Sequence, residues 1–234
     1  MKAVECKQID IDYRGKYVLD KLDLSLEPGH IVGLMGPNGV GKTTLLRILA
    51  GLEMSYKGEA KIFGEEIGKA TKNMVSYQPD HLPLPKDLTA EACVDLYGHF
   101  FGDFDREKAF YMLKSFDLEP SRRIREMSKG MQDKLQVALT LSRKARLYLM
   151  DEPIGGVDPL SRKNVIDGIL GGFDTEATLI ISTHMVEAIE PIIDTAVFLK
   201  DGKVLLNEDV EALRGRYGKD LEAIFREVYD VWAH

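Results

Sequence analysis

The stretch IVGLMGPNGVGKTT, residues 31–44, decides the fold. Its first five residues have the apolar pattern and the length of a buried strand, and KTTLLRILAGL, residues 42–52, has the pattern of a helix. Between them, GPNGVGKT matches G-x-x-x-x-G-K-[ST], the pattern of a loop that binds phosphate between a strand and a helix. The sequence therefore predicts a strand-loop-helix unit of an α/β domain.

The residue types of this loop each suit phosphate binding. The glycines let successive backbone N–H groups curl around a β-phosphate, and the dipole of the following helix adds to the field. Lys42 is placed to neutralise the β- and γ-phosphates, and the hydroxyl of Thr43 is placed to bind Mg²⁺. The residues that we expect to hold the phosphates are Gly36, Pro37, Asn38, Gly39, Val40, Gly41, Lys42, Thr43 and Thr44.

Two further apolar strand patterns end in polar residues. RLYLMDEP, residues 146–153, ends its strand with Asp151 and Glu152, and TLIISTH, residues 178–184, ends with His184. The carboxyl ends of parallel strands converge on a bound nucleotide. We expect Asp151 to hold Mg²⁺, Glu152 to polarise the attacking water and His184 to donate to the γ-phosphate. The alternatives are solvated acids at a turn and a structural histidine.

The rest of the chain adds three smaller regions to this core. Residues 1–27 alternate apolar and polar positions, which predicts two antiparallel strands around the turn RGK and hence a small N-terminal β lobe. Residues 83–142 have helical spacing and predict a helical subdomain. AVFLKDGKVLLNE, residues 196–208, predicts a hairpin, and residues 208–234 predict C-terminal helices. The fold that we expect is a P-loop NTPase core with a mainly parallel sheet, in a single domain over residues 1–234.

The segment EMSKGMQDK, residues 126–134, predicts a helix that begins after Ser128. Gly130 costs about 1 kcal/mol of helix propensity, and Met131 stands where a capping box needs Glu or Gln. One interpretation is a helix cap and nothing more. The other is an anion site, because an open, serine-capped helix N-terminus binds anions.

The bulk composition excludes several classes of protein. The 234 residues include 44% hydrophobic residues, enough for a sizeable core, yet no apolar run reaches the ~18 residues of a membrane span. The net charge of -7 gives no general attraction to nucleic acid. Cys6 and Cys93 lack the spacing of a zinc site, and the acidic N-terminus lacks the apolar core of a signal peptide, so we expect a reduced, cytosolic protein.

The order of the loop at 36–44, the segment MSKGMQ, the DEP turn and the STH strand end resembles the nucleotide-binding subunit of ATP-binding cassette (ABC) transporters. The resemblance runs essentially end to end. It implies ATP and Mg²⁺ as cofactors, and two subunits packed head to tail around two ATP molecules. It also implies that residues 127–131 are the signature motif usually written LSGGQ. The residues that it places on the partner's ATP are Ser128, Lys129, Gly130, Met131 and Asp158.

The resemblance assigns two further roles and shows three departures. It assigns Tyr13, with Tyr17 as a rival, to adenine stacking, and Gln78 to Mg²⁺ and the attacking water. The departures are Lys129 for the first signature glycine, Met131 for the glutamine and Ile154 for a threonine. Lys129 either adds charge near the phosphates or points to solvent. With Glu152 and His184 present, hydrolysis is expected.

The S-K-G-M form of the signature resembles the subgroup that serves exporters of drugs, antimicrobial peptides or envelope compounds. That resemblance implies a separate polytopic membrane permease gripped by residues 83–142, and a location on the inner face of the cell membrane. The second cassette is either an identical or a different chain, and no nucleic acid is expected.

Other nucleotide-binding proteins are alternatives to the exporter subunit. A soluble cassette ATPase of iron-sulfur assembly has a compatible length. The cassettes of DNA repair need long heptad insertions, and those of translation need two cassettes per chain. A GTPase needs N-K-x-D, and none of these features occurs here.

Overall fold

The centre of the molecule is a six-stranded sheet that contains the strand before the phosphate-binding loop. The computed structural model describes residues 1–231. The strands lie in the order β10-β9-β3-β8-β7-β6, and all neighbours are parallel except β10 with β9. The bounds are β3 Ile31–Met35, β6 Val75–Gln78, β7 Leu147–Asp151, β8 Thr178–Thr183, β9 Thr195–Lys200 and β10 Lys203–Asp209. The predicted mainly parallel sheet and the hairpin across Asp201 and Gly202 are confirmed.

The second sheet is small and antiparallel, with the order β2-β1-β4-β5. Its bounds are β1 Val4–Tyr13, β2 Lys16–Leu26, β4 Lys57–Ile62 and β5 Glu65–Glu66. Tyr13 pairs with Lys16 across the turn at Arg14 and Gly15, as the alternating pattern predicts. The N-terminal β lobe is thus confirmed, and β4 and β5 join it from beyond the first helix.

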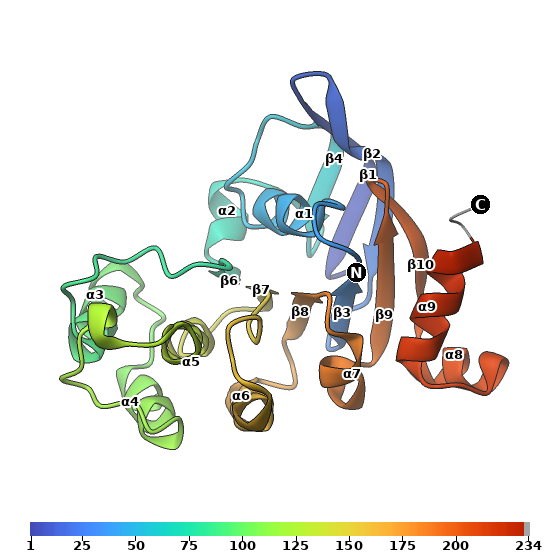
Figure 1. The fold of residues 1–234 in the computed structure, drawn as a ribbon. Helices are drawn as coiled ribbons and strands as arrows, with labels where there is room; N and C mark the ends of the chain where they lie inside the picture. The colour runs from blue at the N-terminus through green and yellow to red at the C-terminus, as the bar shows by residue number, and fades with distance from the viewer. Residues whose placement is uncertain (232–234) are drawn as a thin grey trace.

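The helices of the core lie on both sides of the large sheet (Figure 1). The bounds are α1 Lys42–Leu49, α2 Lys69–Lys72, α6 Pro159–Gly172, α7 Val186–Ile189, α8 Val210–Tyr217 and α9 Leu221–Val231, with a 3₁₀ turn at Glu190–Ile192. In Figure 1, α1 and the small sheet lie above the large sheet, while α6 and α7 lie below it. The end of the predicted C-terminal helices, residues 232–234, lies outside the described residues.

Residues 83–142 contain three longer helices, which stand beside β6 at the far side of the molecule from α8 and α9 (Figure 1). They are α3 Ala90–Phe100, α4 Arg106–Ser115 and α5 Lys129–Leu141, with a 3₁₀ turn at Ile124–Glu126. Thr89, Asp105 and Ser128 cap them by accepting hydrogen bonds from backbone N–H groups. Among residues 1–231, no helix combines the length and hydropathy that crossing a bilayer requires.

Strands β3, β7, β8 and β9 are largely apolar on both faces, and alternate residues enter different cores. Val32 and Leu34 pack with α1 and the small sheet, whereas Met35 packs with the helices on the opposite face. Leu147 and Leu149 alternate with Tyr148 and Met150 in the same way. Burial on both faces fixes the register of β3 and β7, and therefore the positions of the polar residues that follow them.

Candidate nucleotide site

The phosphate-binding loop leaves β3 and enters α1 through glycines that no larger residue could replace without strain. Gly41 is the residue before α1 and has φ +108°. A Cβ added there would lie 2.8 Å from the carbonyl oxygen of Val18. A Cβ on Gly36 would lie 2.7 Å from the carbonyl oxygen of Leu199. The backbone of the loop is therefore packed between β2 and β9 in a fixed shape.

Lys42 turns back over this loop. Its Nζ donates hydrogen bonds to the carbonyl oxygens of Gly36, at 2.7 Å, and Pro37, at 3.2 Å. Nζ also lies 3.6 Å from Oε1 of Glu152. Burial lowers the pKa of Lys42, while the nearby charges of Glu152 and Asp151 oppose this effect. The ammonium group is thus held over the loop where a phosphate would bring further negative charge.

Asp151 ends β7 and is only 1% exposed. Its Oδ1 accepts a hydrogen bond from Oγ of Ser182, at 2.5 Å, because β7 and β8 pair in parallel with these two residues side by side. Burial raises the pKa of Asp151, and hydrogen bonds from Ser182 and Thr43 oppose the increase. The carboxylate therefore lies beside the start of α1.

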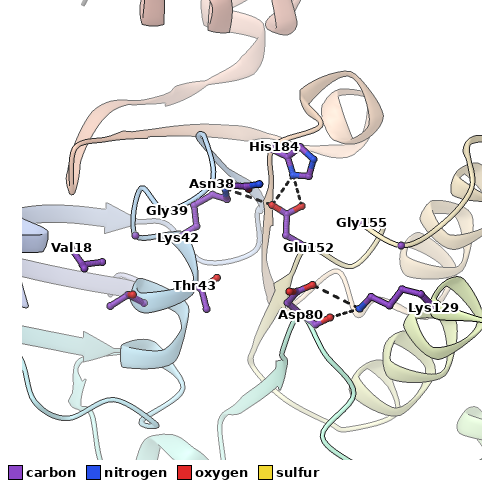
Figure 2. Close-up of a pocket in the computed structure, with 13 residues that line it drawn as sticks. Val18, Asn38, Gly39, Lys42, Thr43, Asp80, Lys129, Glu152, Gly155 and His184 are labelled. Carbon is purple, nitrogen blue, oxygen red and sulfur yellow. Dashed lines mark hydrogen bonds and ion pairs between the residues drawn. The ribbon is translucent and has the colours of Figure 1, made fainter. Parts of the chain in front are cut away.

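Glu152 follows Asp151 in a strained backbone conformation, with φ +49°. Such a conformation costs about 1–3 kcal/mol in a residue other than glycine and is typical of functional sites. The backbone N–H of Glu152 donates to the carbonyl oxygen of Ser182 at 3.1 Å. Nδ1 of His184 lies 3.1 Å from both carboxylate oxygens of Glu152 (Figure 2). The turn therefore aims Glu152 between Lys42 and His184.

Lys42, Glu152 and His184 line one cavity of 670 Å³, which has the size of a small-ligand site. Figure 2 shows Lys42, Glu152 and His184 converging on it from three separate segments. The lining residues are Val18, Asn38, Gly39, Gly41, Lys42, Thr43, Thr44, Asp80, Lys129, Glu152, Gly155, Gly156 and His184. The structure thus brings together residues from the predicted phosphate loop and from two strand ends.

Val18, Asp80, Gly155 and Gly156 line the cavity without having been predicted. Asp80 lies in SYQPD, two residues after Gln78. Since Gln78 was predicted as a site residue, its closeness in sequence could have indicated Asp80 as well. Ser182 was also missed, although it lies in the strand pattern TLIIST that ends beside the acids. Val18 is a strand residue with no such signal.

The oxygen atoms behind the cavity suit Mg²⁺. Oδ2 of Asp151 and Oε1 of Gln78 are buried and make no hydrogen bond within residues 1–231. Gln78 ends β6, which pairs with β7, and Thr43 at the start of α1 helps to keep the pKa of Asp151 from rising further. Mg²⁺ prefers oxygen ligands and is usually held by one or two carboxylates together with substrate phosphates. The two unpartnered oxygens, one of a carboxylate and one of an amide, therefore fit the predicted metal.

The signature segment lies outside this cavity, apart from Lys129. Oγ of Ser128 accepts a hydrogen bond from the N–H of Met131 at 3.2 Å, so the predicted cap is confirmed. Gly130 has a packing reason that the sequence does not show. A Cβ there would lie 3.2 Å from the carbonyl oxygen of Gly156, in the loop after Glu152.

The remaining predicted residues lie apart from the cavity. Asp158 caps α6 by accepting a hydrogen bond from the N–H of Ser161 at 3.1 Å. Tyr13 is half-exposed at the end of β1, and its hydroxyl donates to Glu53 at 3.0 Å. Tyr17 is exposed on the neighbouring strand.

The family model of the ABC transporter matches residues 19–155. The chain belongs to the ABC transporter family. It is an ATP-binding subunit of that family with ATPase activity, and it binds nucleotide. ATPases of this family act as pairs together with membrane permeases.

Relatives of this ABC ATPase include proteins named for resistance and export. The chain is 29% identical to the daunorubicin resistance ATP-binding protein DrrA3 of Streptomyces coeruleorubidus, over 94% of this chain and 73% of the relative. It is 27% identical to the Nod factor export ATP-binding protein I of Sinorhizobium fredii, over 90% of this chain and 64% of the relative. A solved ATP-binding subunit of an ABC transporter superposes with a TM-score of 0.85 at 25% identity, covering 97% of this chain and 99% of that chain.

Proposed function

We propose that this chain is the ATPase subunit of an ABC exporter and works as a head-to-tail pair on the cytoplasmic face of a separate membrane permease. The observation that carries the shared-site arrangement is that Ser128 lies outside the cavity lined by Lys42, Glu152 and His184. Within one chain, Lys129 lines this cavity, but Ser128, Gly130 and Met131 do not, so the capping serine does not face the phosphate loop of its own chain. A second copy brings the two together.

Within one chain, the loop at residues 36–44 binds the triphosphate. The backbone N–H groups and the N-terminus of α1 stabilise the phosphate charge, and Lys42 shifts from its carbonyl partners to the β- and γ-phosphates. Thr43, Asp151 and Gln78 would hold Mg²⁺, which would supply charge neutralisation at the phosphates. Tyr13 is the proposed adenine contact.

Hydrolysis requires a positioned base beside the γ-phosphate. Glu152 accepts the proton of the attacking water, because its carboxylate lies at the cavity wall and the strained turn fixes its direction. His184 holds this carboxylate through Nδ1 and directs its remaining ring nitrogen toward the γ-phosphate. Gln78 orients the water from the end of β6.

From the partner chain, the N-terminus of α5 covers the γ-phosphate. Ser128 orders the first turn by accepting from the N–H of Met131, which leaves the N–H groups of Lys129 and Gly130 to face an anion, and the helix dipole adds to their attraction. Asp158 contacts the same interface from the N-terminus of α6.

The export direction is supported by the relatives named for drug resistance and Nod factor export. In this proposal, the helices of residues 83–142 bind the permease, and ATP-driven pairing moves them. The names of these relatives favour export over the alternative, a soluble cassette of iron-sulfur assembly.

A mixture of two inactive variants tests the shared site. Ser128→Arg blocks the capped helix, and Lys42→Ala removes the phosphate contact. In a mixed pair, one site joins the intact Lys42 of one chain to the intact Ser128 of the other. Random pairing then restores about a quarter of the wild-type sites.

The readout is the ATPase rate of each variant alone and of the mixture, with differently tagged chains to show that mixed pairs form. Circular dichroism of each variant establishes that it is folded. If verified mixed pairs show no recovery, the head-to-tail arrangement is wrong. If the separate variants keep their activity, the assignment of the site residues is wrong.

A further inference from the structure

Lys129, the first residue of α5, is held by two acids of its own chain. Its Nζ lies 2.9 Å from Oδ1 of Asp133, one helical turn along α5, and 3.8 Å from Oδ1 of Asp80. Nζ also donates a hydrogen bond to the carbonyl oxygen of Asp80. Figure 2 shows the side chain reaching across to Asp80, which follows β6. The ammonium group therefore joins two segments that are 49 residues apart in the chain.

Asp133 needs this cation. The residue is 1% exposed, and burial raises the pKa of its carboxyl group while Lys129 opposes the increase. A buried carboxylate that loses its cationic partner is left as an uncompensated charge, which destabilises the structure around it. The charge of Asp133 is therefore tolerated because Lys129 lies against it.

The loop after Glu152 rests directly on this ion pair. The N–H of Gly156 donates to Oδ2 of Asp133 at 3.0 Å. A Cβ added to Gly156 would lie 2.2 Å from Cγ of Lys129 and 2.6 Å from Oδ2 of Asp133. The backbone at 156 thus packs on both partners, and any displacement of the pair displaces the turn that carries Glu152.

We propose that Lys129 is a positioning residue for hydrolysis: with Asp133 it fixes the loop at 153–158 and the segment after Gln78 against the start of α5. The ammonium group acts through these segments and does not bind the γ-phosphate. A change at the signature helix is thereby transmitted to Glu152 and Gln78 of the same chain. This inference rests on the proposed function, because it assigns Lys129 an effect on the hydrolytic groups.

The proposal predicts a separation between turnover and nucleotide affinity. Lys129→Met leaves Asp133 buried and unpaired, so kcat should fall roughly 10- to 100-fold, as expected when a catalytic group is misplaced. KM for ATP should change by less than about twofold, since the phosphate loop is untouched. Lys129→Arg keeps the charge and should retain most of the turnover.

A second substitution gives the decisive comparison. Asp133→Asn keeps an oxygen that can accept from Gly156 and removes the buried charge. The double variant Lys129→Met/Asp133→Asn should therefore recover most of the kcat lost in Lys129→Met. Lys134→Met is the matched control, because Lys134 follows Asp133 on α5 and forms no ion pair within the described chain. It should keep the wild-type kcat.

All variants are assayed below their own unfolding temperatures, so that a loss of folded protein is not counted as a loss of turnover. The proposal is overturned if Lys129→Met raises KM and the Asp133 substitution does not rescue it, because the lysine would then act on the phosphate. It is also overturned if Lys129→Met has no effect. If Lys42→Ala in an otherwise wild-type chain kept its ATPase activity, the proposed function would be overturned instead.

Discussion

The two halves of the proposed ATP site are built in different ways. The half around Lys42 lies at the ends of strands in one sheet, and its charged groups already contact one another. The half around Ser128 lies at the N-terminus of a helix, where a hydroxyl caps backbone N–H groups. The first half carries the reacting side chains, whereas the second offers a dipole and backbone donors.

This difference shows where precision and movement reside. Strand pairing and burial on both faces of the sheet fix Asp151 against Ser182 within hydrogen-bond distance. The helix start at Ser128 belongs to the lobe of residues 83–142, which is tied to the core by the contacts of Lys129 and Gly130. We therefore expect the strand-end half to be rigid and the helix-end half to change position when nucleotide binds.

The largest effect is expected for Lys42→Ala, which removes the cation of the strand-end half. Loss of one partner of a buried charge contact costs about 2–5 kcal/mol, so hydrolysis should fall by roughly 10³-fold and ATP should bind weakly. ATPase assays and titration with a fluorescent ATP analogue measure the two effects. Lys163→Ala, an exposed lysine on α6, is the control. Unchanged ATP binding would show that the rigid half does not depend on this cation.

Glu152→Gln separates the chemistry from the pairing of the two halves. The amide cannot accept the proton of water, so hydrolysis should fall roughly 10²- to 10³-fold, while ATP binding remains. Because the bound ATP persists, the variant should form a stable pair with MgATP, seen as a doubled mass in gel filtration. Lys42→Ala should stay single under the same conditions. A monomeric Glu152→Gln chain at saturating ATP would contradict the sandwich.

His184→Ala should have an intermediate effect. It removes the ring that contacts both carboxylate oxygens of Glu152, without removing the base itself. We expect the ATPase rate to fall about 10- to 100-fold. His99→Ala is the control, because His99 is exposed on α3 and does not line the cavity. Wild-type turnover in His184→Ala would show that the strained turn positions Glu152 unaided.

The smallest effect concerns stability, at Asp151. Burial raises the folded-state pKa of this carboxyl above its unfolded value, so the folded chain binds the proton more tightly than the unfolded chain. The stabilisation from the protonated carboxyl is fully present below the unfolded pKa and is lost as the pH rises through the folded pKa. At neutral pH the charged form therefore destabilises the fold, and Asp151→Asn should raise the Tm. A gain of about 1 kcal/mol corresponds to roughly 2–4 °C for a chain of this size.

Thermal unfolding without nucleotide or Mg²⁺ measures this gain at several pH values. The gain should shrink as the pH falls toward the usual range of a carboxyl group. Asp167→Asn, an exposed acid on α6, should not show it. A lower Tm for Asp151→Asn at neutral pH would mean that hydrogen bonds from Ser182 and Thr43 outweigh the burial of the charge.

Local patterns predicted the elements that have strong periodicity or turn chemistry. The strands at 31–35, 147–151 and 178–183, the start of α5 after Ser128 and the turn at Asp201 and Gly202 all follow from neighbouring residues. β4 and β5 were not predicted, since KGEAKI is polar and half exposed and forms a strand because β1 pairs with it. Short, polar strands carry little sequence signal.

The sequence by itself determined the phosphate loop, the strand-end acids and the helix cap, because each depends on residues within one turn or one strand of each other. Only the tertiary structure decided the partners of Lys129, the packing that requires Gly130, and the strained turn at Glu152. Those contacts join Asp80, α5 and the loop at 153–158, which are brought together by the packing of a lobe against a sheet. No local sequence pattern encodes which distant segments meet, so these contacts can be identified only in the folded chain.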